Sequence, residues 1–112
     1  MHVMTVEVAR TTQEHSIGLM FRRIMSTNDG MIFVFDEPGE RCFWMKNTLL
    51  PLSAAFIADD GQITNIEEMQ PQTLDSHCST RKVRYVLEMN AQWFSKRGIK
   101  AGMKMQGQPF KP

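Results

Sequence analysis

The fold is decided by residues 52–69, which read LSAAFIADDGQITNIEEM. Four apolar residues alternate along the first half and share one face of a strand: Leu52, Ala54, Phe56 and Ala58. Asp59-Asp60-Gly61 is the sequence of a tight turn, because glycine tolerates the positive φ that hairpin turns need. Residues 62–69 then return as a second strand. The segment therefore predicts an antiparallel β-hairpin.

Outside this hairpin the chain consists mostly of further short strands between turns. Alternating or continuous apolar residues predict strands at 3–9, at 31–35, around Trp44, at 83–89 and at 103–106. The segment between 70 and 80 is polar and predicts a loop. The sequence of 112 residues thus predicts a single domain, 1–112, of mainly β class. We expect a small β-barrel or two-sheet sandwich of about seven short strands with two short helices.

The first of these helices is predicted from its N-terminal residues. Thr11 and Glu14 have the spacing of a capping box, in which each side chain bonds the backbone of the other. The helix that follows is expected to bury Ile17, Met20 and Phe21 on one side.

The second helix is predicted near the C-terminal end. Asn90 can cap it, and it would carry Trp93 and Phe94. Lys96 and Arg97 would favour its C-terminal end before Gly98 stops it.

The net charge of +1 conceals an uneven distribution. Residues 1–80 carry five basic and eleven acidic side chains, whereas residues 81–112 carry eight basic side chains and one acid, Glu88. This asymmetry could steer an anionic partner toward the C-terminal third, or the two halves could interleave and offset each other. No apolar run approaches the ~18 residues of a membrane span, so no membrane-spanning segment is expected.

Residues 43–51, FWMKNTLLP, place polar groups inside what otherwise resembles a buried strand. Trp44 and Lys46 point to one face, and Asn47 lies at the strand end. Together they could form a wall that binds a sugar or another flat polar ligand. In the alternative, Trp44 is a core ring, Lys46 extends to water and Asn47 shapes the turn before Pro51.

Arg22 is a further candidate, because it follows the first helix and could reach an anionic group of a ligand; the alternative is a dipole partner at the helix end. The candidate ligand-binding residues are therefore Arg22, Trp44, Lys46 and Asn47. A small polar ligand is the expected partner.

Cys42 and Cys78 could form a disulfide that closes a loop of ~37 residues, or Cys78 could be a nucleophile beside His77, with its partner base supplied by the fold. We expect Cys78 in an accessible loop and Cys42 at least partly buried. Two cysteines alone build neither a four-thiolate zinc site nor a Cys-x-x-Cys motif. The ten methionines are scattered, which favours gap filling in the core over copper binding.

Catalytic motifs are missing from the sequence. It contains no glycine-rich phosphate loop, no Gly-x-Ser-x-Gly and no His-Glu-x-x-His. Glu67 and Glu68 are adjacent and face opposite ways on a strand, and Glu88 could join one of them only if the strands meet. We therefore expect no catalytic residue, no metal and no cofactor, and favour a function other than catalysis.

Separated blocks of the chain resemble one bacterial family, the domain of unknown function 192. These blocks are Gly18–Arg23, Gly30–Phe35, Phe43–Pro51, Asp60-Gly61, Tyr85–Glu88 and Gly98–Gly102. The chain departs from the family pattern at Ser53 and Met103, where similar proteins commonly carry acidic residues. The resemblance implies a bacterial envelope or periplasmic location for a mature or trimmed form, with the cytoplasm as the alternative. It implies no particular activity.

Two functions follow as hypotheses. The first is a small ligand-binding or accessory module of the bacterial envelope. The second is a regulatory domain that binds a polyanion or nucleic acid through its basic C-terminal third, although no recognisable nucleic-acid motif supports it. Salt separates them, because polyanion binding weakens steeply as salt rises and stacking of a neutral ligand does not.

Overall fold

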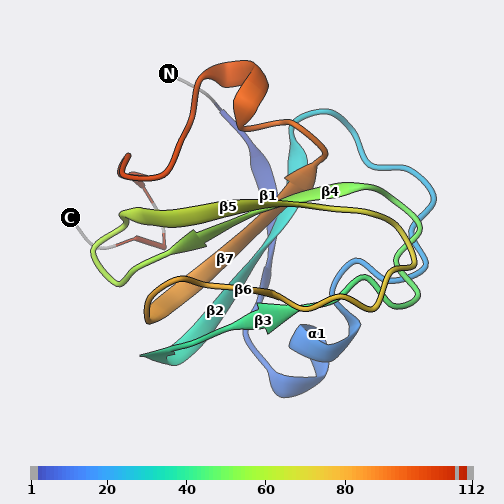
Figure 1. Cartoon of the computed structure of the whole chain (residues 1–112), viewed down its shortest axis with the longest axis horizontal. Helices are drawn as coiled ribbons and strands as arrows, with labels where there is room; N and C mark the ends of the chain where they lie inside the picture. The colour runs from blue at the N-terminus through green and yellow to red at the C-terminus, as the bar shows by residue number, and fades with distance from the viewer. Residues whose placement is uncertain (1–2, 108, 111–112) are drawn as a thin grey trace.

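The computed structural model describes residues 3–107 and 109–110. Across these residues the chain is mainly β, with two sheets and few helices (Figure 1). In chain order the elements are β1 (Thr5–Ala9), α1 (Thr12–Ile17), β2 (Asp29–Gly39), β3 (Cys42–Phe43), β4 (Leu52–Ile57), β5 (Ile63–Met69), β6 (His77–Cys78), β7 (Val83–Asn90) and the 3-10 helix η1 (Ser95–Arg97).

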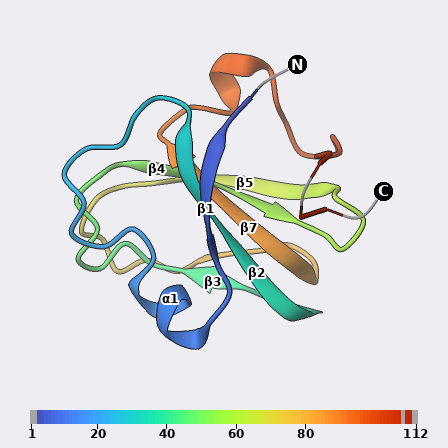
Figure 2. The same ribbon diagram turned by 180° about the vertical axis from the view of Figure 1, so that it is seen from behind.

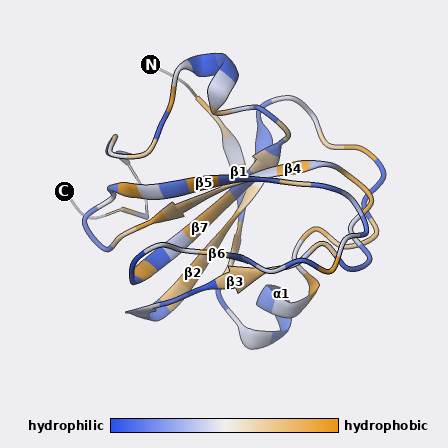
Figure 3. Cartoon of the chain, viewed as in Figure 1, coloured by the Kyte–Doolittle hydropathy of each residue, from blue (hydrophilic) through white to orange (hydrophobic). Residues whose placement is uncertain are grey.

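The larger sheet has five strands in the order β1-β2-β7-β4-β5. β1 runs parallel to β2, and the other neighbours are antiparallel. β7 lies in the middle and β4 is buried along its whole length, so both faces of the sheet are covered. Figure 3 shows the hydrophobic residues concentrated on these central strands.

Each face of this sheet carries its own core cluster. One includes Phe33 and Phe56, and the other includes Ile32 and Leu87. The two-stranded sheet of β3 and β6 belongs to the first face, where the Phe43 ring packs edge-on against Phe33 at 4.8 Å between centroids. Figures 1 and 2 both show α1 beside β3. This corner between α1, β3 and the large sheet contains the candidate site.

The predicted hairpin is confirmed. β4 and β5 pair in register from Leu52 opposite Met69 to Ile57 opposite Ile63, with a bulge near the turn. Gly61 has φ +92, and a Cβ placed there would lie 2.7 Å from the carbonyl oxygen of Met105. Glycine is therefore needed at this turn both for its backbone conformation and for the close approach of the C-terminal segment.

The capping box is also confirmed, but the burial predicted for its helix is wrong. The Glu14 amide donates to Thr11 Oγ1 at 3.0 Å, and the Thr11 amide donates to Glu14 Oε1 at 2.9 Å. Ile17 and Phe21 are 54% and 66% exposed, and Met20 is only half-buried. Gly18 ends the helix at φ +49, and the chain then turns to bury Leu19 instead.

The C-terminal expectations are corrected in part. Asn90 ends β7 and caps no helix, since its side-chain amide donates to the carbonyl oxygens of Met25 and Ser26 at 3.0 and 3.1 Å. The second helix is only the single turn η1, which Gly98 ends in a left-handed conformation as expected. Residues 103–106 form one isolated bridge, Gln62 to Lys104, in place of a strand.

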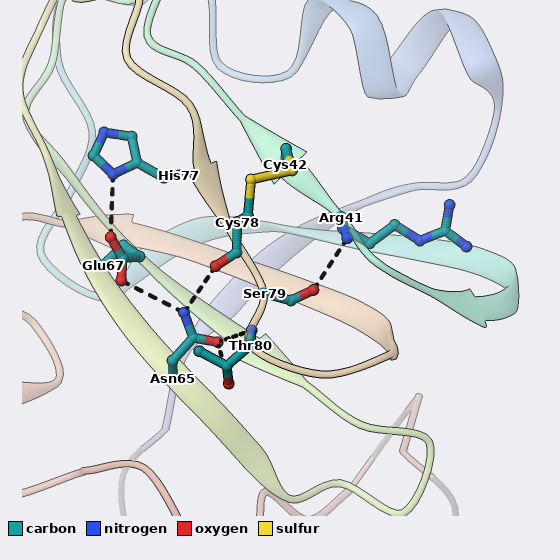
Figure 4. Close-up of a disulfide and its surroundings, with 8 residues drawn as sticks. All are labelled: Arg41, Cys42, Asn65, Glu67, His77, Cys78, Ser79 and Thr80. Carbon is teal, nitrogen blue, oxygen red and sulfur yellow. Dashed lines mark hydrogen bonds and ion pairs between the residues drawn. A yellow bond between two sulfur atoms is a disulfide. The ribbon is translucent and has the colours of Figure 1, made fainter.

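The remaining differences concern the smaller sheet. β6 lies within the segment predicted as a loop, and a closed barrel does not form among the described strands. Cys42 and Cys78 stand directly opposite each other and form a disulfide (Figure 4). The expected exposure is reversed, because Cys42 is exposed and Cys78 is half-buried. With its sulfur in the disulfide, Cys78 has no thiol for nucleophilic catalysis.

Candidate functional site

The candidate site is a pocket of about 390 Å³ on the face of the sheet that α1 and β3 cover. Aromatic side chains from three segments line it. They are Phe33 and Phe35 of β2, Phe43 of β3 and Trp44, which follows β3. His15 of α1 and Glu88 of β7 add titratable groups. Polar side chains such as Thr12 and Thr48 line it as well, so the pocket combines aromatic walls with several polar groups, a combination found in ligand sites.

Glu88 is the most unusual residue of this pocket. It sits on the central strand β7, flanked in register by Met31 of β2 and Ala54 of β4. It is 4% exposed, and among the described residues its carboxyl group has no hydrogen-bond partner. Burial raises the pKa of Glu88 to about 8, because the charged form loses its hydration. At neutral pH Glu88 is therefore mainly a neutral carboxylic acid.

Aromatic rings hold the pocket walls in contact with the core. Phe43 packs edge-on against Phe33 and, at 6.2 Å between centroids, against Phe56. The His15 ring lies 4.4 Å from Phe35. Gly18 allows this arrangement, because a Cβ there would lie 3.2 Å from the tip of the Phe33 ring. Edge-to-face pairs of this kind fix ring orientation beyond simple burial.

His15 fastens α1 to the sheet. Its Nε2 lies 2.9 Å from the carbonyl oxygen of Ala9 and 3.0 Å from that of Val34. Both neighbours are acceptors, so Nε2 must carry a proton. His15 thereby joins the end of β1 to β2 and positions the helix at the edge of the pocket.

Arg41 lines the pocket from the segment between β2 and β3. Its guanidinium lies over the Phe35 ring, 4.1 Å from the centroid, and Nη2 donates to the Glu37 carbonyl oxygen at 2.5 Å. Its backbone amide donates to Ser79 Oγ at 3.1 Å (Figure 4). Nε is enclosed and has no partner within the described part of the chain. The Arg41 Nε–H is thus covered by surrounding atoms and leaves one hydrogen bond unmade.

Trp44 is the one predicted ligand-binding residue that lines the pocket. Its side chain is 49% exposed, so the alternative that made it a core ring is wrong. Lys46 Nζ lies 5.3 Å from the Trp44 ring centroid, a cation–π contact, but Lys46 does not line the pocket.

Asn47 and Arg22 lie outside the pocket lining. Asn47 adopts φ +56 and its carbonyl oxygen accepts from the Phe21 amide at 2.8 Å, as the alternative role in the turn requires. Arg22 forms a two-point ion pair with Glu7 of β1, which lowers the pKa of Glu7 and raises that of Arg22. The structure therefore does not bring the four candidates together.

The segment that carries Trp44 is anchored by the disulfide and its surroundings. Figure 4 shows Cys42–Cys78 joining β3 to β6, with Asn65 of β5 donating to the Cys78 carbonyl oxygen at 3.0 Å. Nδ1 of His77 lies 3.2 Å from Oε1 of Glu67 on β5. These contacts fix the two-stranded sheet against the edge of the large one.

Sequence reasoning missed the buried acid at the centre of the site. The sequence suggests Glu88 only as a partner of Glu67 or Glu68, and the structure does not pair them, because β4 lies between β5 and β7. One signal was available: Glu88 follows the apolar residues 85–87 and precedes Met89, so a strand covered on both faces would bury its carboxyl group.

Within residues 3–107 and 109–110, no group of three or more His, Cys, Asp or Glu side chains is arranged to hold a metal ion. In the same residues, no helix has the length and hydrophobicity to cross a membrane.

Comparison with known proteins gives a family and two similar structures. The family model DUF192, described as Uncharacterized ACR, matches residues 1–107. A crystal structure from Sinorhizobium meliloti, described as a candidate transcription regulator, is 41% identical, with a TM-score of 0.91 and coverage of 95% of this chain and 83% of that one. A protein of unknown function from Novosphingobium aromaticivorans is 36% identical, with a TM-score of 0.91 and coverage of 95% and 76%. No curated protein matches the chain.

Proposed function

The chain belongs to the DUF192 family, as its sequence blocks predicted, and we propose that it is a small-ligand-binding module of the bacterial envelope whose site is the pocket beside Glu88. The observation that carries this proposal is the Glu88 carboxyl group. It is buried on the central strand, lines the pocket and has no hydrogen-bond partner among the described residues.

Burial of such a group is unfavourable for the fold. A polar group that loses most of its water without a protein partner costs up to roughly 1–3 kcal/mol, and an apolar residue at position 88 would avoid that cost. A residue that weakens the fold while facing a pocket is typical of a binding or catalytic site. We interpret Glu88 as the group that receives a ligand.

The disulfide supports the proposed location. Cys42 and Cys78 are the two cysteines of the chain, and they are joined in the structure. Disulfides form and persist in oxidising compartments such as the bacterial periplasm and are rare in the cytoplasm. A mature protein in the envelope would keep this bond.

A second candidate, polyanion binding in gene regulation, is favoured by the description of the Sinorhizobium protein as a candidate transcription regulator. The arrangement of the basic residues argues against it. Arg84 and Lys104 pair with the acidic turn residues Asp59 and Asp60 at 2.6 and 3.8 Å. Lys96 and Arg97, in η1, follow the opposite end of β7 from Arg84 (Figure 1). The basic third is therefore divided and partly neutralised.

The proposed function is tested by a fragment screen read out on backbone amide resonances. We expect hits to shift the amides of His15, Trp44 and Glu88 together, because these residues line one pocket. A short DNA duplex titrated at low and at physiological salt is the matched control. Strong, salt-sensitive shifts confined to residues 81–104, without fragment hits at the pocket, would contradict the proposal and favour polyanion binding.

A further inference from the structure

We propose that the pocket binds an uncharged planar ligand that presents a hydrogen-bond donor and acceptor side by side, as a lactam or other cyclic amide does, to the carboxyl group of Glu88. This inference rests on the proposed function and specifies its ligand class. Glu88, the nearby charges and the aromatic walls each restrict the ligand.

The hydrogen-bonding groups of Glu88 determine which ligand edge fits it. A neutral carboxylic acid offers one O–H donor beside one carbonyl acceptor. A cyclic amide carries the complementary pair, with its N–H next to its C=O, so the two edges can close two hydrogen bonds at once. No described residue uses either position of the Glu88 carboxyl group, which leaves both for a ligand.

The charged side chains of the pocket favour an uncharged ligand. Glu40 and Arg41 both line the pocket, one of each sign. A cationic ligand would meet the Arg41 guanidinium, an anionic ligand would meet Glu40, and either would have to lose its hydration beside a Glu88 that is 4% exposed. An uncharged ligand avoids all three costs.

The shape of the pocket favours a small, flat ligand. Phe33, Phe43 and Trp44 supply flat apolar surfaces around the acid, and Trp44 is accessible enough to close over a bound ring. A volume of about 390 Å³ lies near the lower end of the range for small-molecule sites, roughly 300–1,000 Å³. The pocket thus suits a ligand of one or two rings.

Four probes of similar size test this inference by amide-resonance titration at pH 7. They are 2-pyridone, N-methyl-2-pyridone, benzylamine and benzoate. We expect 2-pyridone to shift the pocket amides, and each of the others to bind at least tenfold more weakly. Methylation removes the N–H donor, and the last two probes carry a charge.

Two substitutions assign the effect to Glu88. Glu88→Gln keeps a donor beside an acceptor and is expected to bind 2-pyridone within about threefold of wild type. Glu88→Met removes both and is expected to lose at least tenfold in affinity. Both variants carry uncharged side chains of similar length, and their amide spectra check that the fold is retained.

A pH series separates Glu88 from the other titratable groups. His15 of α1, Glu40 and Arg41 before β3, and Glu67 across β4 face the same side of the sheet, whereas the strand neighbours Met31 and Ala54 do not titrate. Wild-type affinity for 2-pyridone is expected to fall about tenfold from pH 7 to pH 9, as the donor is lost. Glu88→Gln keeps the other groups, so its affinity is expected to stay constant.

The outcomes are distinct. If benzylamine binds more tightly than 2-pyridone, with affinity that rises with pH, the ligand class is wrong while the proposed binding function survives. Tighter binding of benzoate would overturn the class in the same way. If none of the probes shifts the pocket amides at the highest soluble concentration, and the fragment screen also finds no ligand there, both proposals are wrong.

Discussion

Glu67 and Glu88 occupy matching places on either side of β4, and both are opposite Ala54. The side chain of Glu67 is 38% exposed and its Oε1 lies 3.2 Å from His77 Nδ1. Glu88 is 4% exposed, without a partner among the described residues. Two carboxyl groups on one face of one sheet thus differ in solvation and in partners. The satisfied one belongs to the structure that anchors β6, and the unsatisfied one is available to a ligand.

The largest expected loss of stability comes from removing the disulfide that holds β6 near Glu67. Replacing Cys42 and Cys78 together by serine removes the disulfide that joins β3 to β6. We expect a loss of about 3–4 kcal/mol in the free energy of unfolding, from the chain entropy of a ~37-residue loop. Urea denaturation of the variant, compared with oxidised wild type, measures this. A loss below about 1 kcal/mol would show that the disulfide does not hold this region.

The next effect concerns the Glu88 side and depends on pH. The pKa of Glu88 rises from 4.5 to about 8 on folding. The stability that depends on a protonated Glu88 is therefore fully present below pH 4.5 and is lost as pH rises toward 8. Glu88→Gln does not titrate. We therefore expect it to be more stable than wild type by about 3 kcal/mol at pH 7 and no more stable at pH 4. Urea denaturation at both values checks the difference.

Glu67→Gln is the matched control for that experiment. Glu67 is partly exposed and contacts His77, so its replacement should leave stability unchanged or lower it by at most about 1 kcal/mol at pH 7. Equal stabilisation by both substitutions would mean that the two carboxyl groups do not differ as the structure indicates.

The smallest effects on stability are expected at Trp44 and Lys46. Trp44 is 49% exposed, so Trp44→Ala should cost about 1 kcal/mol or less while weakening 2-pyridone binding several-fold. Lys46→Met should change stability by less than about 1 kcal/mol and leave binding of an uncharged probe intact, since Lys46 contacts the ring from outside the pocket lining. Thermal melts and titrations of both variants measure these effects. If Lys46→Met lost binding and Trp44→Ala did not, Lys46 would be part of the ligand-binding site.

Local sequence determined the features that were predicted correctly. The turn at Asp59-Asp60-Gly61 and the capping box of Thr11 and Glu14 depend on residues within a few positions of each other. Strand β6 was missed because His77 and Cys78 pair with β3 across a long separation, and their own sequence lacks a strand pattern.

The site was harder to predict for the same physical reason. Glu88 is buried because β2 and β4 flank β7, and no short stretch of sequence contains that pairing. Trp44 is predicted from the polar residues beside it in an otherwise apolar segment. Arg22 and Asn47 are predicted as ligand-binding residues from their residue types and sequence positions alone. In the structure both residues have partners outside the pocket: Arg22 pairs with Glu7, and the carbonyl oxygen of Asn47 accepts from the Phe21 amide.

Titration of the Glu88 carboxyl group shows most directly whether Glu88 is a neutral, buried acid at neutral pH. Side-chain 13C resonances of wild type are followed from pH 3 to pH 10, with Glu88→Gln used to assign the signal. We expect a midpoint at about 8 for Glu88. A midpoint at or below 4.5, the value of an unburied glutamate, would show that the group is hydrated or paired and that Glu88 is not a neutral acid at pH 7.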